Sequence, residues 1–447
     1  MRDCVPVRGI INYYHQKILV IRVWQNFLAV MELAGWVFIA LIHQVRARQG
    51  SYYRFLSVFQ IPMPEGDVPA PVSVRTPDQL PFVVNRFKLA GHLTYGSIRL
   101  QLRRSLNPAA EDGAPMARYG VRFENDPSLT PLDLQELGVL AEELGYETVW
   151  APEGGGRDSL TALAAIALRT ERVRLGTGIL PIYARTATNT AMGAAGMAAV
   201  SGGRFILGLG VGHRPTVEGR DGVPFRQPIA RLMETISIVR GLLSGETVSA
   251  EGRHFNIASA SLGGAAPKER VPIYIAALGP QMLELAGEMA DGVLMNWTAE
   301  SFIREAVEHV KHGAEKAGRD PSEIDIAGYV RVAAGGDEDA VRESLRGQVA
   351  RYASNTFYRN FFVETGFCEE MAEAANALAA GDLARASEAI TQEMQDQLAV
   401  VGTPEECRAA LERRRAAGLQ LPVVAPFAIG DNKESHRQTI TAMAPGG

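Results

Sequence analysis

The chain has 447 residues, of which 47% are hydrophobic and 21% charged, and its formal net charge at pH 7 is −5. This is the composition of a globular protein, and the length allows one large domain or two to three ordinary ones. The net negative charge and the lack of a basic stripe interleaved with aromatic residues argue against a nucleic-acid-binding protein.

The three cysteines are Cys4, Cys368 and Cys407, which lie far apart and form no C-x-x-C pattern. Such spacing favours a reducing compartment and provides neither a disulfide framework nor a zinc site. We therefore expect a cytoplasmic protein without a metal centre.

Residues 1–115 differ from the rest of the chain and allow two explanations. Their apolar run from Phe27 to Ile42 is interrupted by Glu32 and is shorter than the ~18 residues that a membrane span requires. A membrane-proximal segment is thus the less favoured explanation. Alanine becomes abundant only near Met116, where a strand pattern begins. We expect Met116 to be the natural start and residues 116–447 to form the folded domain, which N-terminal sequencing of the native protein would test.

From residue 116 onward, apolar strand patterns alternate with helical patterns. The predicted strands lie at residues 119–123, 147–153, 172–182, within 201–215, and at 271–277, 291–297, 324–334 and 421–427. Most are hydrophobic throughout, which is typical of parallel strands buried on both faces.

Start and stop signals delimit the helices between these strands. Thr130 is expected to cap a helix that ends at Gly145, and Thr298 to cap the helix after the sixth strand. Thr403 and Glu406 have the spacing of a capping box.

Eight such units over roughly 330 residues predict an α/β fold, a (β/α)8 TIM barrel. The helical region at residues 337–398 is longer than a barrel connection needs, so we expect a helical insertion before the last strand. An open doubly wound sheet is the alternative fold.

In a TIM barrel the active site lies at the carboxyl ends of the strands. The residues found at these ends are Glu153, Gly178, Ile179, Gly212, His213, the turn Ala276 to Pro280, Asn296 and Trp297. This position, rather than residue type alone, selects them as candidates.

The stretch SGGRFILGLGVGHRP, residues 201–215, carries three glycines in the pattern G-x-G-x-G. A dinucleotide fingerprint needs G-x-G-x-x-G after the first strand of its fold, so the Rossmann interpretation is rejected. Gly212 and the Gly279–Pro280 turn can instead offer backbone N–H groups to one phosphate. Tight turn geometry alone is the alternative explanation for each.

Four ordered motifs, GYETVWAPE, RVRLGTGILPIYAR, SGGRFILGLGVG and PIYIAALGPQMLELAGEMADGVLMNW, resemble the bacterial luciferase-like superfamily. More narrowly, the chain is similar to the actinobacterial branch that uses the deazaflavin coenzyme F-420. The resemblance covers about residues 117–430. It implies a barrel that holds coenzyme F-420 or FMN and acts on a small-molecule substrate, and we also expect a homodimer.

The resemblance also implies which residues contact the cofactor. They are Gly178, Ile179, Val211, Gly212, Ala276, Ala277, Leu278 and Gly279. The Gly178–Ile179 bond corresponds to a non-proline cis peptide of deazaflavin members, and the phosphate contacts correspond to Val211, Gly212, Leu278 and Gly279.

His213 and Glu153 are the candidate catalytic residues. An imidazole can donate or accept a proton beside the carbon that exchanges hydride, and a carboxylate can contact the cofactor ring or act as a base. A backbone hydrogen bond is the alternative role for His213, and an ion pair with Arg157 or Arg185 is the alternative for Glu153.

Two positions depart from the sugar-phosphate dehydrogenases of the branch. Gly154 stands where they have a histidine, and His213 stands where they have a glutamate. We therefore expect hydride transfer between reduced coenzyme F-420 and another organic substrate. The alternatives are an FMN-dependent monooxygenase that uses O2 and a barrel that binds ligands without catalysis.

Overall fold

The computed structural model describes residues 118–154, 156–427 and 429–445. Parallel strands form a closed barrel, because β1 pairs with both β2 and β12 and β9 pairs with β10. The barrel strands are β1 (Gly120–Arg122), β2 (Thr148–Ala151), β3 (Arg174–Thr177), β5 (Phe205–Gly210), β8 (Ile273–Ala276), β9 (Gly292–Met295), β10 (Asp325–Ala334) and β12 (Leu421–Pro426). The predicted TIM barrel is confirmed.

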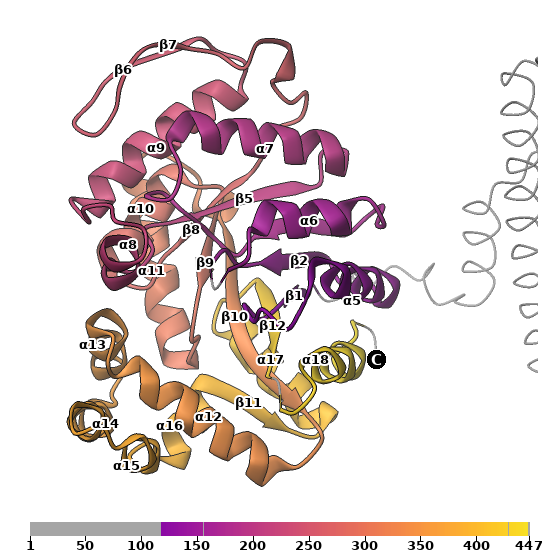
Figure 1. Ribbon diagram of the computed structural model, residues 1–447, viewed down its shortest axis with the longest axis vertical. Coiled ribbons are helices and arrows are strands. Elements are labelled where there is room, and N and C mark those ends of the chain that lie inside the picture. Colours follow the sequence, from indigo (N-terminus) through magenta and orange to yellow (C-terminus); the bar gives the residue numbers. More distant parts are fainter. Residues whose placement is uncertain (1–117, 155, 428, 446–447) are drawn as a thin grey trace, which may run out of the picture. The chain divides into compact units, whose positions relative to one another are not determined.

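Helices between the strands cover the outside of the barrel (Figure 1). They are α5 (Pro131–Leu144), α6 (Ser159–Ala167), α7 (Ala187–Ser201), α9 (Pro228–Leu243), α10 (Pro280–Met289), α11 (Glu300–Lys316), α17 (Pro404–Ala416) and α18 (Asn432–Ala442). The expected caps at Thr130, Gly145 and Thr403 are present, and Glu406 completes the capping box of α17.

The prediction that Thr298 caps a helix is wrong. Ala299 is the N-cap of α11, without a side-chain cap. The buried Thr298 hydroxyl donates instead to the Tyr329 carbonyl at 3.1 Å. Thr298 therefore ties the loop after β9 to β10, a contact that exists only once the barrel has closed.

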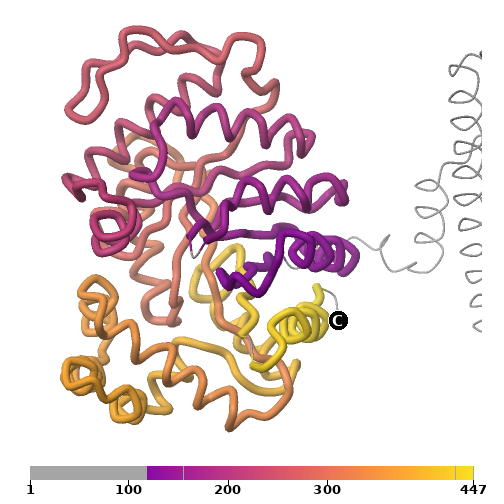
Figure 2. Tube along the Cα trace, viewed as in Figure 1, coloured from indigo at the N-terminus to yellow at the C-terminus, as the bar shows by residue number. Residues whose placement is uncertain are grey.

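The helical insertion lies where it was predicted, before the last strand. It consists of α12 (Glu338–Tyr352), α13 (Thr356–Glu364), α14 (Cys368–Ala379), α15 (Leu383–Glu388) and α16 (Gln392–Leu398). In Figure 2 these helices form a separate orange layer beside the barrel. The following strand β11 (Ala399–Gly402) pairs with the carboxyl-terminal residues of β10, from Arg331 to Ala334, and is not one of the eight strands of the closed barrel.

The structure divides the predicted strand at residues 172–182 into β3 and β4, and it adds smaller elements that were not predicted. β4 (Leu180–Pro181) extends the third barrel segment and pairs with β5. A short helix, α8 (Arg214–Gly219), follows β5, and a hairpin of β6 (Val248–Glu251) and β7 (Asn256–Ala260) precedes β8. α8 has six residues and the two hairpin strands have four and five, so their patterns are too short to stand out in the sequence.

The barrel interior is filled by inward-facing side chains of several strands, including Trp150, Ile206, Tyr274, Leu294, Tyr329 and Val423. The Trp150 indole lies so close to Gly176 that a Cβ built on this glycine would be 2.2 Å from Trp150 Cε3. Glycine is required there because even the methyl group of an alanine would overlap the Trp150 indole.

Ion pairs close the amino-terminal end of the barrel. Arg118 binds both Glu147 and Asp325, and these bonds raise the pKa of its guanidinium. The Tyr274 hydroxyl donates to Asp325 at 2.6 Å. These polar groups are paired with one another, so this end of the barrel contributes to stability. The candidate catalytic and binding residues lie at the opposite end, where the strands have their carboxyl termini.

Within the described residues no helix is both long and apolar enough to cross a bilayer. The expectations for residues 1–115 lie outside the described part of the chain.

Candidate active site at the carboxyl ends of the barrel strands

His213 lies directly after β5, where it begins α8, and its ring packs against α13 of the insertion. The imidazole centroid is 5.3 Å from the Tyr358 ring and 6.5 Å from the Phe357 ring. Burial lowers the pKa of His213 below its usual value, which favours the neutral imidazole. Neither ring nitrogen is hydrogen-bonded to another described residue. Both nitrogens therefore remain available to a ligand.

Gly210 lies beside two of the expected cofactor positions, Ile179 and Ala276. A Cβ built on Gly210 would lie 2.8 Å from Ile179 Cδ1 and 3.3 Å from Ala276 Cβ. The segment after β3 and the ends of β5 and β8 thus meet at one point of the barrel mouth. The lack of a side chain on Gly210 makes room for the Ile179 side chain beside Ala276.

The two expected phosphate turns follow neighbouring strands, because β5 pairs with β8. Gly212 has a φ of +69°, which favours glycine, and Gly279 is the N-cap of α10 without a side-chain cap. Neither backbone N–H has a hydrogen-bond partner among the described residues. Free N–H groups at a glycine turn and at a helix N-terminus fit a phosphate.

The remaining cofactor positions surround these turns. Ala277 and Leu278 are buried, and Val211 is partly buried against the core. The structure thus gathers the predicted cofactor positions at the mouth, and their contact with a cofactor remains a prediction.

The cis peptide that the resemblance implied at Gly178–Ile179 is not found, since every peptide bond among the described residues is trans. Gly178 is held on both sides in this form. Its N–H donates to the Ala151 carbonyl at 2.7 Å, and its carbonyl accepts from the Tyr329 hydroxyl at 3.3 Å.

Glu153, at the end of β2, forms the ion pair that was its alternative role. Its carboxylate lies 3.4 Å from Arg185 and accepts from the Ser159 N–H at 3.2 Å. Arg157 donates instead to backbone carbonyls, among them that of Glu124 at 2.6 Å. Arg185 also binds Asp158 at 2.5 Å, so the two carboxylates share one arginine. The catalytic role of Glu153 stays a prediction.

Arg331 on β10 was missed by the sequence analysis. Its Nη1 donates to Asn296 Oδ1 at 2.7 Å, and its guanidinium lies over the Trp297 ring, 3.3 Å from the centroid. Asn296 Nδ2 in turn donates to the Tyr358 hydroxyl at 2.8 Å. The available signal was an arginine in phase with Ala327 and Tyr329, on the inward face of an otherwise apolar strand.

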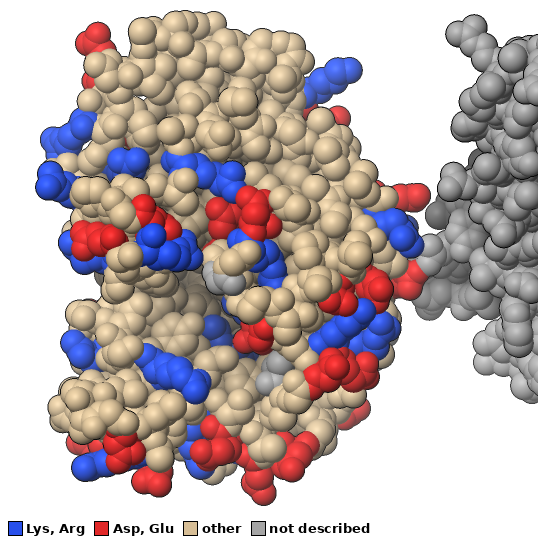
Figure 3. Space-filling view, viewed as in Figure 1, with Lys and Arg blue, Asp and Glu red and all other residues tan. Residues whose placement is uncertain are grey.

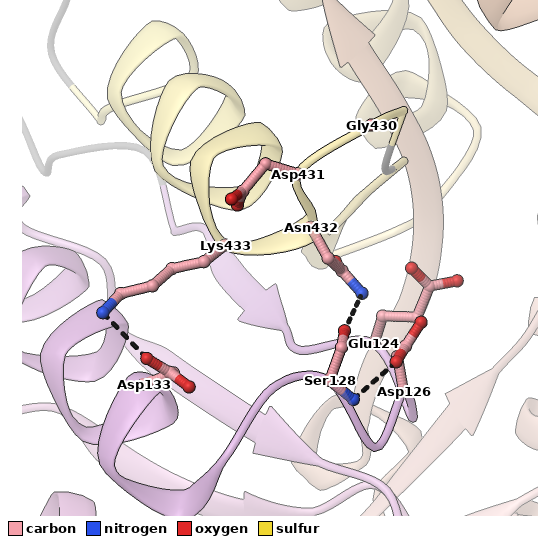
Figure 4. Close-up of a pocket in the computed structure, with 8 residues that line it drawn as sticks. All are labelled: Glu124, Asp126, Ser128, Asp133, Gly430, Asp431, Asn432 and Lys433. Atoms are coloured by element: carbon pink, nitrogen blue, oxygen red, sulfur yellow. Dashed lines mark hydrogen bonds and ion pairs between the residues drawn. The ribbon is translucent and has the colours of Figure 1, made fainter.

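A second group of polar residues lies where β1 and β12 end. It lines a hollow of about 600 Å³ formed by Glu124, Asp126, Ser128, Asp133, Gly430, Asp431, Asn432 and Lys433 (Figure 4). Lys433 binds Asp133 at 2.8 Å, and the Ser128 N–H donates to Asp126 at 2.7 Å. The first bond joins α18 to α5, and the second lies within the loop after β1. Asn432 Nδ2 joins α18 to this loop by donating to the Ser128 hydroxyl at 3.5 Å. Burial raises the pKa of Glu124, which faces the barrel mouth from the same loop.

The insertion and the β5 loop form two sides of the mouth. In the view of Figure 1, α8 and α13 face each other, and the space-filling view shows a cleft opening between them with Lys or Arg atoms inside it (Figure 3). The contact of His213 with α13 lies between the same two elements.

A model of the luciferase-like monooxygenase family matches residues 116–421. The chain belongs to this family. As a luciferase-like protein it is an oxidoreductase, and its sequence is similar to the 5,10-methylenetetrahydromethanopterin reductase of Methanolobus tindarius. The two are 35% identical over 320 residues, which are 71% of this chain and 96% of that enzyme. An F-420-dependent glucose-6-phosphate dehydrogenase of Kribbella flavida is 34% identical over 231 residues, 48% of this chain and 69% of that enzyme.

Solved structures of luciferase-like proteins have the same barrel. The coenzyme F-420-dependent tetrahydromethanopterin reductase of Methanopyrus kandleri has a TM-score of 0.63 at 25% identity, over 74% of this chain and 99% of that one. The oxygenating constituent of 3,6-diketocamphane monooxygenase from Pseudomonas putida, solved with FMN, has a TM-score of 0.55 at 16% identity, over 74% and 97%. The second likeness shows the fold alone.

Proposed function

We propose that this luciferase-like protein is a coenzyme F-420-dependent oxidoreductase that transfers hydride to or from a small organic substrate at the barrel mouth. The observation that carries the proposal is His213, which lies directly after β5 and whose ring nitrogens have no hydrogen-bond partner among the described residues. Support for the cofactor comes from the relatives of 34–35% identity, one of which is named for F-420. The likeness to the FMN-containing monooxygenase is one of fold, so FMN is the less favoured cofactor.

The residues at the mouth fit such a cofactor. The N–H groups of Gly212 and Gly279, which have no partner among the described residues, suit its phosphate. Its ring is proposed to lie beside Ile179, where Gly210 and Ala276 add little side-chain volume. Reduced coenzyme F-420 supplies a hydride when it is bound. The chain itself binds and orients the two reactants.

His213 is the proposed proton donor or acceptor for the substrate. Burial against Tyr358 and the resulting low pKa keep its imidazole neutral near pH 7, so that one ring nitrogen can accept a proton while the other can donate one. Glu153 is proposed to act indirectly, by holding the Arg185 guanidinium in place beside the barrel mouth.

The substrate is proposed to differ from a sugar phosphate. Gly154 and His213 replace the histidine and glutamate of the sugar-phosphate dehydrogenases, which removes the imidazole from the first position and exchanges the carboxylate for an imidazole at the second. A methylene-tetrahydropterin is a candidate from the relatives' names and is tested directly as a substrate.

The test is a fluorescence titration of the purified full-length protein with coenzyme F-420 and, separately, with FMN. We expect saturable binding of F-420 that an excess of FMN does not displace. Tighter binding of FMN would contradict the proposal and support the monooxygenase. Binding of F-420 without any turnover of carbonyl or pterin substrates would support the non-catalytic barrel.

A further inference from the structure

Arg331 is a buried cation without an acidic partner. The residue is 6% exposed, and among the described residues no carboxylate lies within ion-pair distance of its guanidinium. Glu124 at the barrel mouth interacts with this charge only from beyond ion-pair distance. Burial lowers the pKa of Arg331 to about 10, so the side chain still carries its charge at pH 7. Arg122, whose guanidinium lies 5.3 Å from the Tyr329 ring centroid, adds a second positive charge nearby.

A buried charge without a partner costs several kcal/mol of folding free energy, and a well-packed apolar residue would remove that cost. The other buried arginine on this side of the barrel illustrates the difference. Arg414 donates to three backbone carbonyls, those of Thr298, Ala410 and Gln397. Arg331 has one hydrogen bond, to the neutral Asn296. A ligand that supplies the missing charge would explain why an arginine is placed there.

The contacts of Arg331 define which part of it a ligand can reach. Asn296 occupies Nη1, and Trp297 covers one face of the guanidinium. Asn296 is itself fixed by Tyr358. The Nη1 bond to Asn296 is the one hydrogen bond of the guanidinium to a described residue, which leaves the edge formed by Nε and Nη2 open to a ligand. A guanidinium edge held in a fixed plane matches the two oxygens of a carboxylate.

We propose that Arg331 recognises the substrate through a carboxylate bound on its Nε–Nη2 edge, so that the substrate is an organic acid. The inference rests on the proposed oxidoreductase function and names its substrate class. The phosphate turns follow β5 and β8, whereas Arg331 lies on β10, with β9 between β8 and β10. The proposed carboxylate of the substrate would therefore bind at a different strand from the cofactor phosphate. Tyr358 contacts the His213 ring and, through Asn296, orients Arg331, which places acid recognition and proton transfer around one residue.

The test is a calorimetric titration of the full-length protein, loaded with F-420, using benzoate, its neutral counterpart benzamide, and inorganic phosphate. We expect benzoate to bind at least about tenfold more tightly than benzamide, since a hydrogen-bonded ion pair is lost in the amide. Arg331→Met should weaken benzoate binding by about tenfold or more, and its affinity for F-420, measured without benzoate, should stay unchanged.

Two further variants keep the test decisive if Arg331→Met does not fold. Asn296→Asp places a carboxylate on Nη1 without changing side-chain shape, and it should also weaken benzoate binding by about tenfold. Arg351→Met removes an exposed arginine of α12 and should leave benzoate binding unchanged.

The outcomes separate this inference from the proposed function. Equal affinity for benzoate and benzamide, or a loss of F-420 affinity in Arg331→Met, would overturn the inference. Tighter binding of phosphate than of benzoate, abolished by the same substitution, would replace the carboxylate by a phosphate ester. Arg331-dependent benzoate binding by a protein that does not bind F-420 would refute the proposed function and leave the acid site standing.

Discussion

The Tyr358 ring of the helical insertion packs against the His213 imidazole of the β5 loop, with ring centroids 5.3 Å apart. The two residues are 145 positions apart in the chain and meet only at the barrel mouth. Burial lowers the pKa of His213, and Tyr358 is one of the residues that cover its ring. A helix of the insertion therefore forms part of the surroundings of the candidate catalytic residue.

Replacement of His213 should separate turnover from cofactor binding. We expect His213→Ala to lower kcat by about 100-fold or more, which is the range of general acid–base catalysis. The variant lacks the imidazole that is proposed to exchange a proton with the substrate. The affinity for F-420, measured by fluorescence, should be nearly unchanged. His312→Ala, an exposed histidine of α11, is the matched control. A parallel loss of turnover and affinity would remove His213 from the catalytic role.

Removal of the Tyr358 ring should change the pH dependence. Tyr358→Ala exposes His213 to water, so the pKa of its imidazole should rise toward the ordinary value, and the acidic limb of the pH–rate profile should move to higher pH. Tyr358→Phe keeps the ring and should leave this pKa in place. NMR titration of the His213 ring protons measures the shift directly. An identical pKa in the two variants would show that the ring does not bury the imidazole.

A larger side chain at Gly210 should block the cofactor. Gly210→Val directs methyl groups at Ile179 and Ala276, which already lie within 3.3 Å of the added Cβ, and the displaced groups narrow the mouth. We expect the affinity for F-420 to fall by at least about tenfold, because the displaced side chains would no longer contact the cofactor in the proposed way. In the control Gly196→Ala, the new Cβ has no neighbour within 4 Å, and α7 should gain up to about 1 kcal/mol. Unchanged F-420 affinity in Gly210→Val would place the cofactor elsewhere.

Acid should destabilise the fold through His436. Its Nδ1 faces the Asn432 carbonyl at 2.8 Å, and its Nε2 accepts from the Glu124 N–H at 3.1 Å, so a second ring proton has no place. Burial lowers the pKa of His436 to about 4, from 6.5. Between these values the unfolded chain binds more protons, so stability is complete above pH 6.5 and falls as the pH drops to 4, by about 3 kcal/mol.

Urea unfolding at several pH values measures this loss. His436→Gln should be less stable at pH 7 and lose this part of the pH dependence, whereas His312→Gln should keep it. An unchanged pH dependence in His436→Gln would assign the acid sensitivity to other groups.

Much of the barrel could be predicted because its signals are local. Apolar runs, the proline and glycine positions and the Thr403–Glu406 capping box depend on residues a few positions apart, and they hold in the structure. The strand ends then located the candidate cofactor positions, since parallel strands present their carboxyl ends on one side. The identity of the cofactor and the substrate needs direct binding measurements.

The sequence by itself determined the order of the eight strand–helix units, the place of the insertion and the position of His213 after β5. Only the tertiary structure decided that Tyr358 covers His213, that Thr298 bonds β10 rather than capping α11, and that Arg331 lacks an acidic partner. These contacts join segments separated by 31 to 145 positions, so they depend on barrel closure and on how the insertion folds back. The periodicity of apolar residues in a sequence predicts which face of a helix or strand a side chain occupies. Which residue that side chain contacts depends on how the elements pack together.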